Sequence, residues 1–308
     1  MSTRNGVGTE ASPTAAAAPV SAPGSQTPTN QNPSTGPLDW ARISRAARDA
    51  AYNNSAAVPE SPVLNTAREV ASAAFRAANP LALNLPYGPR PRNAWDLFPV
   101  PDPDAPCLVF LHGGYWQRNT REQFANLMAG PRAIGWATAL PGYTLAPDAS
   151  LTEIVAEINA ALDWLATHGP KHGIAGPLVL SGWSAGGHLT AMCLGHPAVR
   201  AGLAISGVFE MGPIRDTYLN EKLRLTEEEI VALSPLRHPP VPKPLAIAYG
   251  TAELAALVGD SRSLHAKRAA AHQPGPLIPV AGANHFTIVH ELRDVRGVLT
   301  RQLPLLLD

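Results

Sequence analysis

Short, mostly apolar runs recur through the chain. A run of four to six mostly apolar residues without charged interruption is typical of a strand that a parallel sheet buries on both faces. Such runs lie at 107–111, 137–140, 177–180, 201–206 and 245–249. These segments therefore predict a central, mostly parallel sheet.

The segments between the runs have helical periodicity. Over 151–167 apolar residues recur every three or four positions, as on the buried face of an amphipathic helix. Ser150 and Glu153 precede them with the S-x-x-E spacing of a capping box. Strands that alternate with helices in this way predict an α/β fold with helices on both faces of the sheet.

The amino-terminal part of the chain divides into two sections. Residues 1–37 contain no Leu, Ile, Phe, Trp or Tyr, so they cannot bury enough apolar surface to fold, and we predict a disordered tail. Residues 39–79 predict a helical prefix that is broken at Pro59 and Pro62. The prediction is thus a tail, 1–37, and one α/β domain, 38–308.

One polar stretch of the prefix, Tyr52-Asn53-Asn54, is unusual for a plain surface helix. We favour a helix end with Asn as its C-cap, and the alternative is a contribution to a pocket rim.

The second half of the chain predicts further elements. Residues 209–240 form a long excursion with a helix at 226–233, which we interpret as a lid or pocket wall. Residues 260–272 predict a helix, 277–280 a short edge strand, and the chain from about 287 a closing helix.

Candidate chemistry begins at Gly182-Trp183-Ser184-Ala185-Gly186, which lies between a predicted strand and a predicted helix. G-x-S-x-G in that context is a nucleophile elbow, a sharp turn that exposes the serine hydroxyl at the edge of the sheet. Ser184 is therefore the candidate nucleophile.

A serine hydroxyl needs a histidine base, and the base needs a carboxylate that orients it. Behind an elbow of this kind the order along the chain is serine, acid, histidine. His285 lies in a loop before the last helix, and Glu253 follows the strand at 245–249. Asp260 is the main alternative acid, and His290 is the alternative base.

Backbone amides are the candidate donors for the oxyanion. The Ala185 amide lies at the start of the helix behind the elbow, and Gly113-Gly114-Tyr115 follow His112 at the end of the first buried strand. Trp116 comes next and is interpreted as a pocket wall, with core packing as the alternative.

Composition limits the partners. Lys plus Arg and Asp plus Glu both number 24, so no net field attracts nucleic acid or a membrane surface, and a small-molecule substrate is expected. Cys107 and Cys193 are interpreted as buried apolar residues and not as a disulfide. Because no export signal is recognisable, we expect a cytoplasmic location.

The motifs His112-Gly113-Gly114-Tyr115-Trp116-Gln117, Gly182–His188 and Asn284-His285-Phe286 resemble those of the kynurenine formamidase (arylformamidase) group of α/β-hydrolases. The resemblance covers about residues 38–308. It implies an α/β-hydrolase fold and hydrolysis of an N-formyl arylamine without metal or organic cofactor.

The resemblance also implies roles for individual residues. It gives a triad of Ser184, Glu253 and His285, although the group more typically has Asp at the acid position. It gives oxyanion amides at Gly114, Tyr115 and Ala185. His112, Gly113, Trp116 and Trp183 are the expected substrate-binding residues.

Two other functions remain open at this point. One is a carboxylesterase that acts on short-chain or aryl esters with the same residues. The other, more remote, is a hydrolase fold that binds a ligand without catalysis. A homodimer is an open possibility for the assembly.

Overall fold

The computed structural model describes residues 40, 42–80 and 82–308. The predicted disordered tail, 1–37, lies outside the described residues. Within the described part of the chain, no helix is both long enough and apolar enough to span a membrane.

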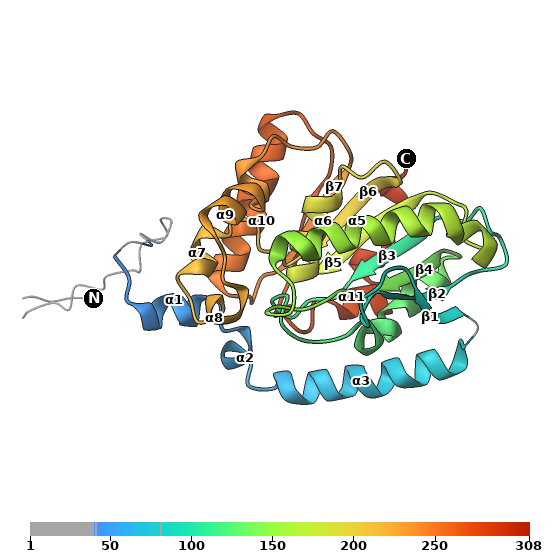
Figure 1. The fold of residues 1–308 in the computed structure, drawn as a ribbon, viewed down its shortest axis with the longest axis horizontal. Helices are drawn as coiled ribbons and strands as arrows, with labels where there is room; N and C mark the ends of the chain where they lie inside the picture. Colours follow the sequence, from blue (N-terminus) through green and yellow to red (C-terminus); the bar gives the residue numbers. More distant parts are fainter. Residues whose placement is uncertain (1–39, 41, 81) are drawn as a thin grey trace, which may run out of the picture. The chain divides into compact units, whose positions relative to one another are not determined.

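The centre of the fold is an eight-stranded sheet in the order β1-β2-β4-β3-β5-β6-β7-β8 (Figure 1). β2 pairs antiparallel with both of its neighbours, and the remaining pairs are parallel. The strands are β1 (Ala82–Pro86), β2 (Ala94–Phe98), β3 (Cys107–Leu111), β4 (Ala137–Pro141), β5 (Leu178–Trp183), β6 (Val199–Ile205), β7 (Leu245–Gly250) and β8 (Leu277–Val280). The predicted mostly parallel sheet is confirmed, and 277–280 is its edge strand.

Each face of the sheet has its own apolar core, because neighbouring residues of a strand point to opposite faces. In β3, Val109 and Leu111 belong to one core, and Leu108 and Phe110 belong to the other. The first core is covered by α5 (Leu151–His168), α6 (Ala185–Cys193) and α10 (Ala255–Ala270). The second is covered by η1 (Arg121–Met128), α11 (His290–Arg293) and α12 (Val298–Gln302). Helices therefore lie on both faces, as predicted.

The helical prefix consists of α1 (Arg45–Ala51), α2 (Asn54–Ala57) and α3 (Ser61–Ala78). The predicted break at Pro62 is wrong. Pro62 lies in the first turn of α3, where a missing N–H breaks no helical hydrogen bond. α3 packs along η1 on the second face and runs below the sheet in the view of Figure 1.

Other helix predictions hold in part. The capping box at Ser150 and Glu153 is present at the start of α5. α10 begins before the predicted start at 260, and the single predicted closing helix is wrong, because α11 ends at Arg293 and α12 starts at Val298. Cys107 and Cys193 are buried free thiols.

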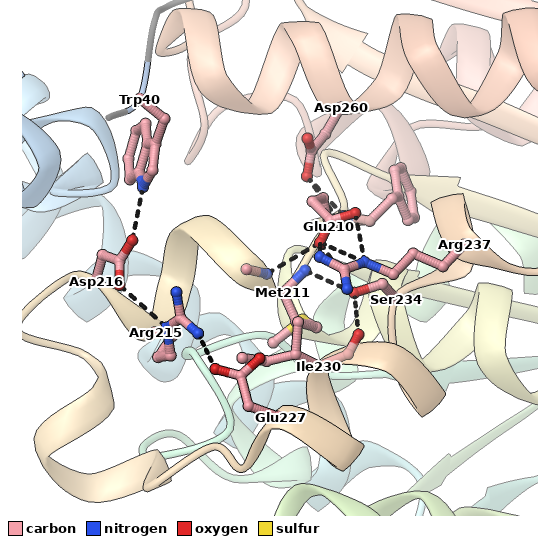
Figure 2. Close-up of polar contacts among 12 residues, drawn as sticks. Trp40, Glu210, Met211, Arg215, Asp216, Glu227, Ile230, Ser234, Arg237 and Asp260 are labelled. Atoms are coloured by element: carbon pink, nitrogen blue, oxygen red, sulfur yellow. Dashed lines mark hydrogen bonds and ion pairs between the residues drawn. The ribbon is translucent and has the colours of Figure 1, made fainter. Parts of the chain in front are cut away.

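The excursion at 209–240 contains α7 (Gly212–Arg215), α8 (Asn220–Leu223), α9 (Glu227–Ala232) and η3 (Pro235–Arg237). Figure 2 shows the polar contacts that fasten it. Arg237 forms an ion pair of 2.7 Å with Glu210, and the Trp40 indole donates to Asp216 at 3.2 Å. Polar contacts thus join parts of the excursion to one another and also join the excursion to Trp40, which precedes the helical prefix.

Candidate active site

Ser184 lies between β5 and α6 with φ 59° and ψ −117°. A positive φ is unfavourable for a residue with a side chain, and such strain is frequent at active sites. The Ser184 amide donates to Ile205 O at 2.8 Å, and the His188 amide donates to Ser184 O at 3.1 Å. The turn predicted for a nucleophile elbow is therefore present, and the serine is 2% exposed.

The glycines of the elbow are required by close backbone contacts. A Cβ atom at Gly182 would lie 2.2 Å from Gly186 O. A Cβ atom at Gly186 would lie 2.0 Å from Leu111 O. Neither contact is possible for a real Cβ, so the tight strand-to-helix turn excludes larger residues at both positions.

His285 and Glu253 form a direct contact. The distance from His285 Nδ1 to Glu253 Oε2 is 2.8 Å, and the two side chains are 4% and 0% exposed. The other carboxylate oxygen, Oε1, accepts from the Ser206 hydroxyl and from the Gly250 amide, both at 2.6 Å. Glu253 is therefore fixed on one side by two donors and presents its second oxygen to the imidazole.

The alternative acid and base lie elsewhere. Asp260 Oδ2 accepts from the backbone amides of Phe209 and Glu210, at 2.6 and 3.3 Å (Figure 2). Burial of this carboxyl, together with the nearby Glu210 charge, raises the pKa of Asp260 to about 7. Desolvation lowers the pKa of His290, which lies on α11. The hydrogen bonds that Asp260 accepts come from the excursion at 209–240 and not from His285.

A cavity of about 50 Å³ contains both Ser184 and His285. It is lined by Asn54, Ser55, Asn65, Gly114, Tyr115, Arg118, Asn119, Trp183, Ser184, His285 and Phe286. Among these described residues Arg118 is the only Lys, Arg, Asp or Glu. No residue of 209–240 is in this lining, so the excursion does not form the wall of the cavity in this structure.

Gly114 and Tyr115 approach the cavity with φ of 122° and 52°. A Cβ atom at Gly114 would meet Arg118 O at 2.4 Å, so this position needs glycine. Between the described residues, no hydrogen bond has the amide of Gly114, Tyr115 or Ala185 as its donor. These three amides are thus available to an oxyanion.

The prefix holds the Tyr115 side chain. Its hydroxyl donates to Tyr52 O at 2.6 Å and accepts from Asn54 Nδ2 at 2.8 Å. Asn53 is the N-cap of α2 and not the C-cap of α1, because the C-cap of α1 is Tyr52. The pocket-rim alternative therefore describes Asn54, which lines the cavity.

Of the four expected substrate-binding residues, one lines the cavity and three do not. Trp183 lines the cavity, its ring centroid lies 4.8 Å from that of His285, and its indole donates to His285 O at 2.8 Å. His112, Gly113 and Trp116 are absent from the lining. His112 stacks on Tyr143 with 4.2 Å between ring centroids, and burial lowers its pKa to about 3.

Trp116 is 0% exposed and packs edge-on against His188, with 5.0 Å between ring centroids. His188 contacts Leu233 O through Nε2 at 2.8 Å, and burial lowers the His188 pKa to about 4. The imidazoles of His112 and His188 are therefore both neutral at physiological pH.

Sequence reasoning missed Ser206, Asn65 and Arg118 as site residues. Ser206 is the last residue of the predicted strand 201–206, and a hydroxyl at the carboxyl end of a buried strand is a usable signal. Asn65 and Arg118 carried no signal, because a polar residue on an exposed helix or loop is the ordinary case.

A second hollow in the structure lies apart from the candidate site. A larger hollow of about 250 Å³ includes Met192, Pro235 and Leu264 but neither Ser184 nor His285. In the described part of the chain, no group of three or more His, Cys, Asp or Glu could hold a metal ion.

Known proteins are similar to this chain in sequence and in fold. The BD-FAE family model matches residues 98–198. Kynurenine formamidase of Danio rerio is 25% identical over 291 residues, which are 86% of this chain and 97% of the relative. An esterase of Fusarium pseudograminearum is 30% identical over 105 residues, about a third of each chain. A crystal structure of a Silicibacter sp. TM1040 protein is 29% identical, with a TM-score of 0.74 and coverage of 82% of this chain and 97% of that one.

The fold, the elbow and these relatives define an α/β-hydrolase, and the predicted fold class is confirmed. The chain is an enzyme of the serine hydrolase class that acts on esters or amides. Within that class it is a kynurenine formamidase-like α/β-hydrolase.

Proposed function

We propose that the enzyme removes a small acyl group from an aryl amide, with an N-formylkynurenine-type arylformamide as its substrate. The observation that carries the proposal is the cavity of about 50 Å³ that Ser184 and His285 both line, with the His285 imidazole hydrogen-bonded to Glu253. So small a space suits a formyl group better than a long acyl chain. The relative from Danio rerio, which is similar over most of both chains, carries the same activity in its name.

The proposed mechanism is acyl transfer in two steps. Ser184 Oγ attacks the carbonyl carbon while His285 Nε2 takes its proton, and Glu253 stabilises the imidazolium through Nδ1. The negative charge on the tetrahedral oxygen is held by the amides of Gly114, Tyr115 and Ala185, and the α6 dipole adds to the Ala185 contribution.

The intermediate then collapses. The carbon–nitrogen bond breaks, His285 returns the proton to the leaving amine, and the acyl group remains on Ser184. Water, deprotonated by His285, attacks the acyl-enzyme, releases formate and restores the serine. No step requires a metal or an organic cofactor.

Substrate contacts in this proposal come from Trp183 and from the polar rim at Asn65 and Arg118. We propose that His112, Gly113 and Trp116 act from behind the cavity. Gly113 permits close packing, since a Cβ there would lie 2.7 Å from Trp183 O, and the buried rings of His112 and Trp116 support the loop.

The test compares kcat/KM for N-formylkynurenine with kcat/KM for short-chain aryl esters. A formamidase has the higher value on the formamide. A clear preference for the esters would support the second candidate, a carboxylesterase, which the Fusarium pseudograminearum esterase favours. Ser184→Ala is expected to lower kcat by roughly 10⁵- to 10⁶-fold on either substrate. Activity equal to that of the unmodified enzyme would reject the serine mechanism.

The domain boundary at residue 38, the cytoplasmic location and a homodimer remain predictions from the sequence.

A further inference from the structure

The wall of the catalytic cavity contains a buried hydrogen-bond acceptor without a partner. Asn54, the first residue of α2, is 4% exposed and lines the cavity with Ser184 and His285. Among the described residues, none donates a hydrogen bond to its side-chain oxygen, Oδ1. A buried polar atom that lacks a partner is costly, so such atoms are rare and need an explanation.

The orientation of the Asn54 amide follows from its neighbours. Tyr115 has a single hydroxyl proton, and this proton points to Tyr52 O, which can only accept. The Tyr115 oxygen must therefore accept from Asn54, so the group that faces it at 2.8 Å is the amide nitrogen. Oδ1 is the other end of the same amide. The described residues supply no donor for it, and a molecule bound in the cavity is the remaining source.

We propose that Asn54 is a specificity-determining residue that accepts a hydrogen bond from the N–H of the scissile amide. This inference rests on the proposed function. An amide substrate brings an N–H beside the carbonyl carbon that Ser184 attacks, whereas an ester has an oxygen there and no donor. An amide substrate therefore gives Asn54 Oδ1 a hydrogen-bond donor, whereas an ester leaves Oδ1 unpaired.

The same contact assists the chemistry. The leaving nitrogen must direct its lone pair at His285 to receive the proton. An acceptor that holds the N–H fixes the rotation of the nitrogen, and the lone pair is then directed away from Asn54. The contact thus favours both binding of an amide and departure of its amine.

The experiment uses the full chain and a matched pair of substrates, formanilide and phenyl formate, which share acyl and aryl groups and differ at the N–H. For each variant the measured quantity is kcat/KM on formanilide divided by kcat/KM on phenyl formate. In Asn54→Leu, which removes the acceptor, we expect this ratio to fall by about 5- to 100-fold, as for the loss of one buried hydrogen-bond partner.

Tyr115→Phe is the matched control. Like Asn54→Leu, it removes the hydrogen bond between Asn54 and Tyr115, but it keeps Asn54 Oδ1. Activity on both substrates is therefore expected to fall by a similar factor, and the ratio is expected to stay within about 2-fold. Asn54→Asp keeps an acceptor oxygen and is expected to retain more of the amide preference than Asn54→Leu. If Asn54→Leu lacks a cooperative thermal transition, Asn54→Ala carries the same test.

The outcomes separate the two proposals. An unchanged ratio in Asn54→Leu, or the same change in Tyr115→Phe, overturns the role of Asn54 and leaves the proposed function intact. If the unmodified enzyme hydrolyses phenyl formate but neither formanilide nor N-formylkynurenine, it is a carboxylesterase, and both the proposed function and the role of Asn54 are rejected. Failure to hydrolyse formanilide, phenyl formate and N-formylkynurenine rejects the proposed function itself, and the role of Asn54 with it.

Discussion

Replacement of Glu253 by glutamine tests the proposed triad, because Glu253 Oε2 determines which nitrogen of His285 carries the proton. Oε1 of Glu253 accepts from the Gly250 amide and the Ser206 hydroxyl, and Oε2 faces His285 Nδ1. In Glu253→Gln the side-chain oxygen is expected to stay with the two donors. The amide nitrogen then faces His285.

The magnitude follows from this geometry. The reverse orientation would place the NH₂ group against the Gly250 N–H, which cannot become an acceptor, and would leave a buried donor unpaired at a cost of about 1–3 kcal/mol. An NH₂ group at Nδ1 requires the His285 tautomer with its proton on Nε2, and that tautomer cannot take the proton of Ser184. We expect kcat to fall by about 10⁴-fold, the loss known for the same change in a serine protease triad.

The assay is kcat across the pH range for Glu253→Gln, Glu253→Ala and Asp260→Asn, with a thermal melt of each variant. Glu253→Ala leaves room for water and does not impose the wrong tautomer, so its loss is expected to be about 10³- to 10⁴-fold, no larger than that of glutamine. Asp260→Asn is expected to retain activity within about 10-fold. A larger loss in Asp260→Asn than in Glu253→Gln would show that the acid is wrongly assigned.

Three further predictions concern other parts of the structure. The pKa of Asp260 in the fold, about 7, lies above the ordinary value of 3.8, so its contribution to stability is complete below about pH 4 and is lost as the pH rises to about 7. In urea titrations at several pH values, Asp260→Asn is expected to flatten this dependence, and an unchanged slope would contradict it. Gly186→Ala forces a Cβ atom to within 2.0 Å of Leu111 O, and we expect a lower melting temperature together with loss of activity, whereas Gly259→Ala, where nothing lies within 4 Å, is the neutral control. Arg118→Ala is expected to raise KM about 5-fold for anionic aryl formamides and to leave KM for neutral ones unchanged, because Arg118 is the only Lys, Arg, Asp or Glu among the described residues that line the cavity. An equal rise for both substrates would show that the Arg118 charge does not select them.

Much of the fold could be predicted from local sequence. Buried strands such as Cys107–Leu111 show in the chain as apolar runs, and the capping box at Ser150 marks the start of α5. The break between α11 and α12 could not be predicted, because the 294–297 segment contains no proline and its turn depends on Gly297 packing on Glu291 O. A helix-breaking contact of this kind is tertiary and leaves no periodic trace.

Some residues of the candidate site could also be predicted from local sequence, and others could not. His285 and Glu253 could be proposed because each follows a strand end, and their contact joins residues that a parallel sheet brings to one edge. Asn54 could be proposed for a pocket rim only as an alternative to a helix end, since its place in the cavity depends on how α2 packs on the Tyr115 hydroxyl. Trp116 shows the opposite error: its neighbours in the chain suggested a pocket wall, but the side chain turns inward against His188.

Backbone strain marks the site more sharply than any residue type does. Of the eight non-glycine residues with positive φ in the described chain, five lie in the loops around Ser184, namely Tyr115, Trp116, Asn119, Ser184 and Ser206. Each such residue costs on the order of 1–3 kcal/mol, and a folded chain keeps it only where surrounding contacts fix it. Here the fixing contacts are the Ser206–Glu253 bond, the prefix bonds to the Tyr115 hydroxyl and the packing of Trp116. The prefix is therefore part of the catalytic unit, because without Tyr52 and Asn54 the strained Tyr115 amide would lose the contacts that hold it beside Ser184.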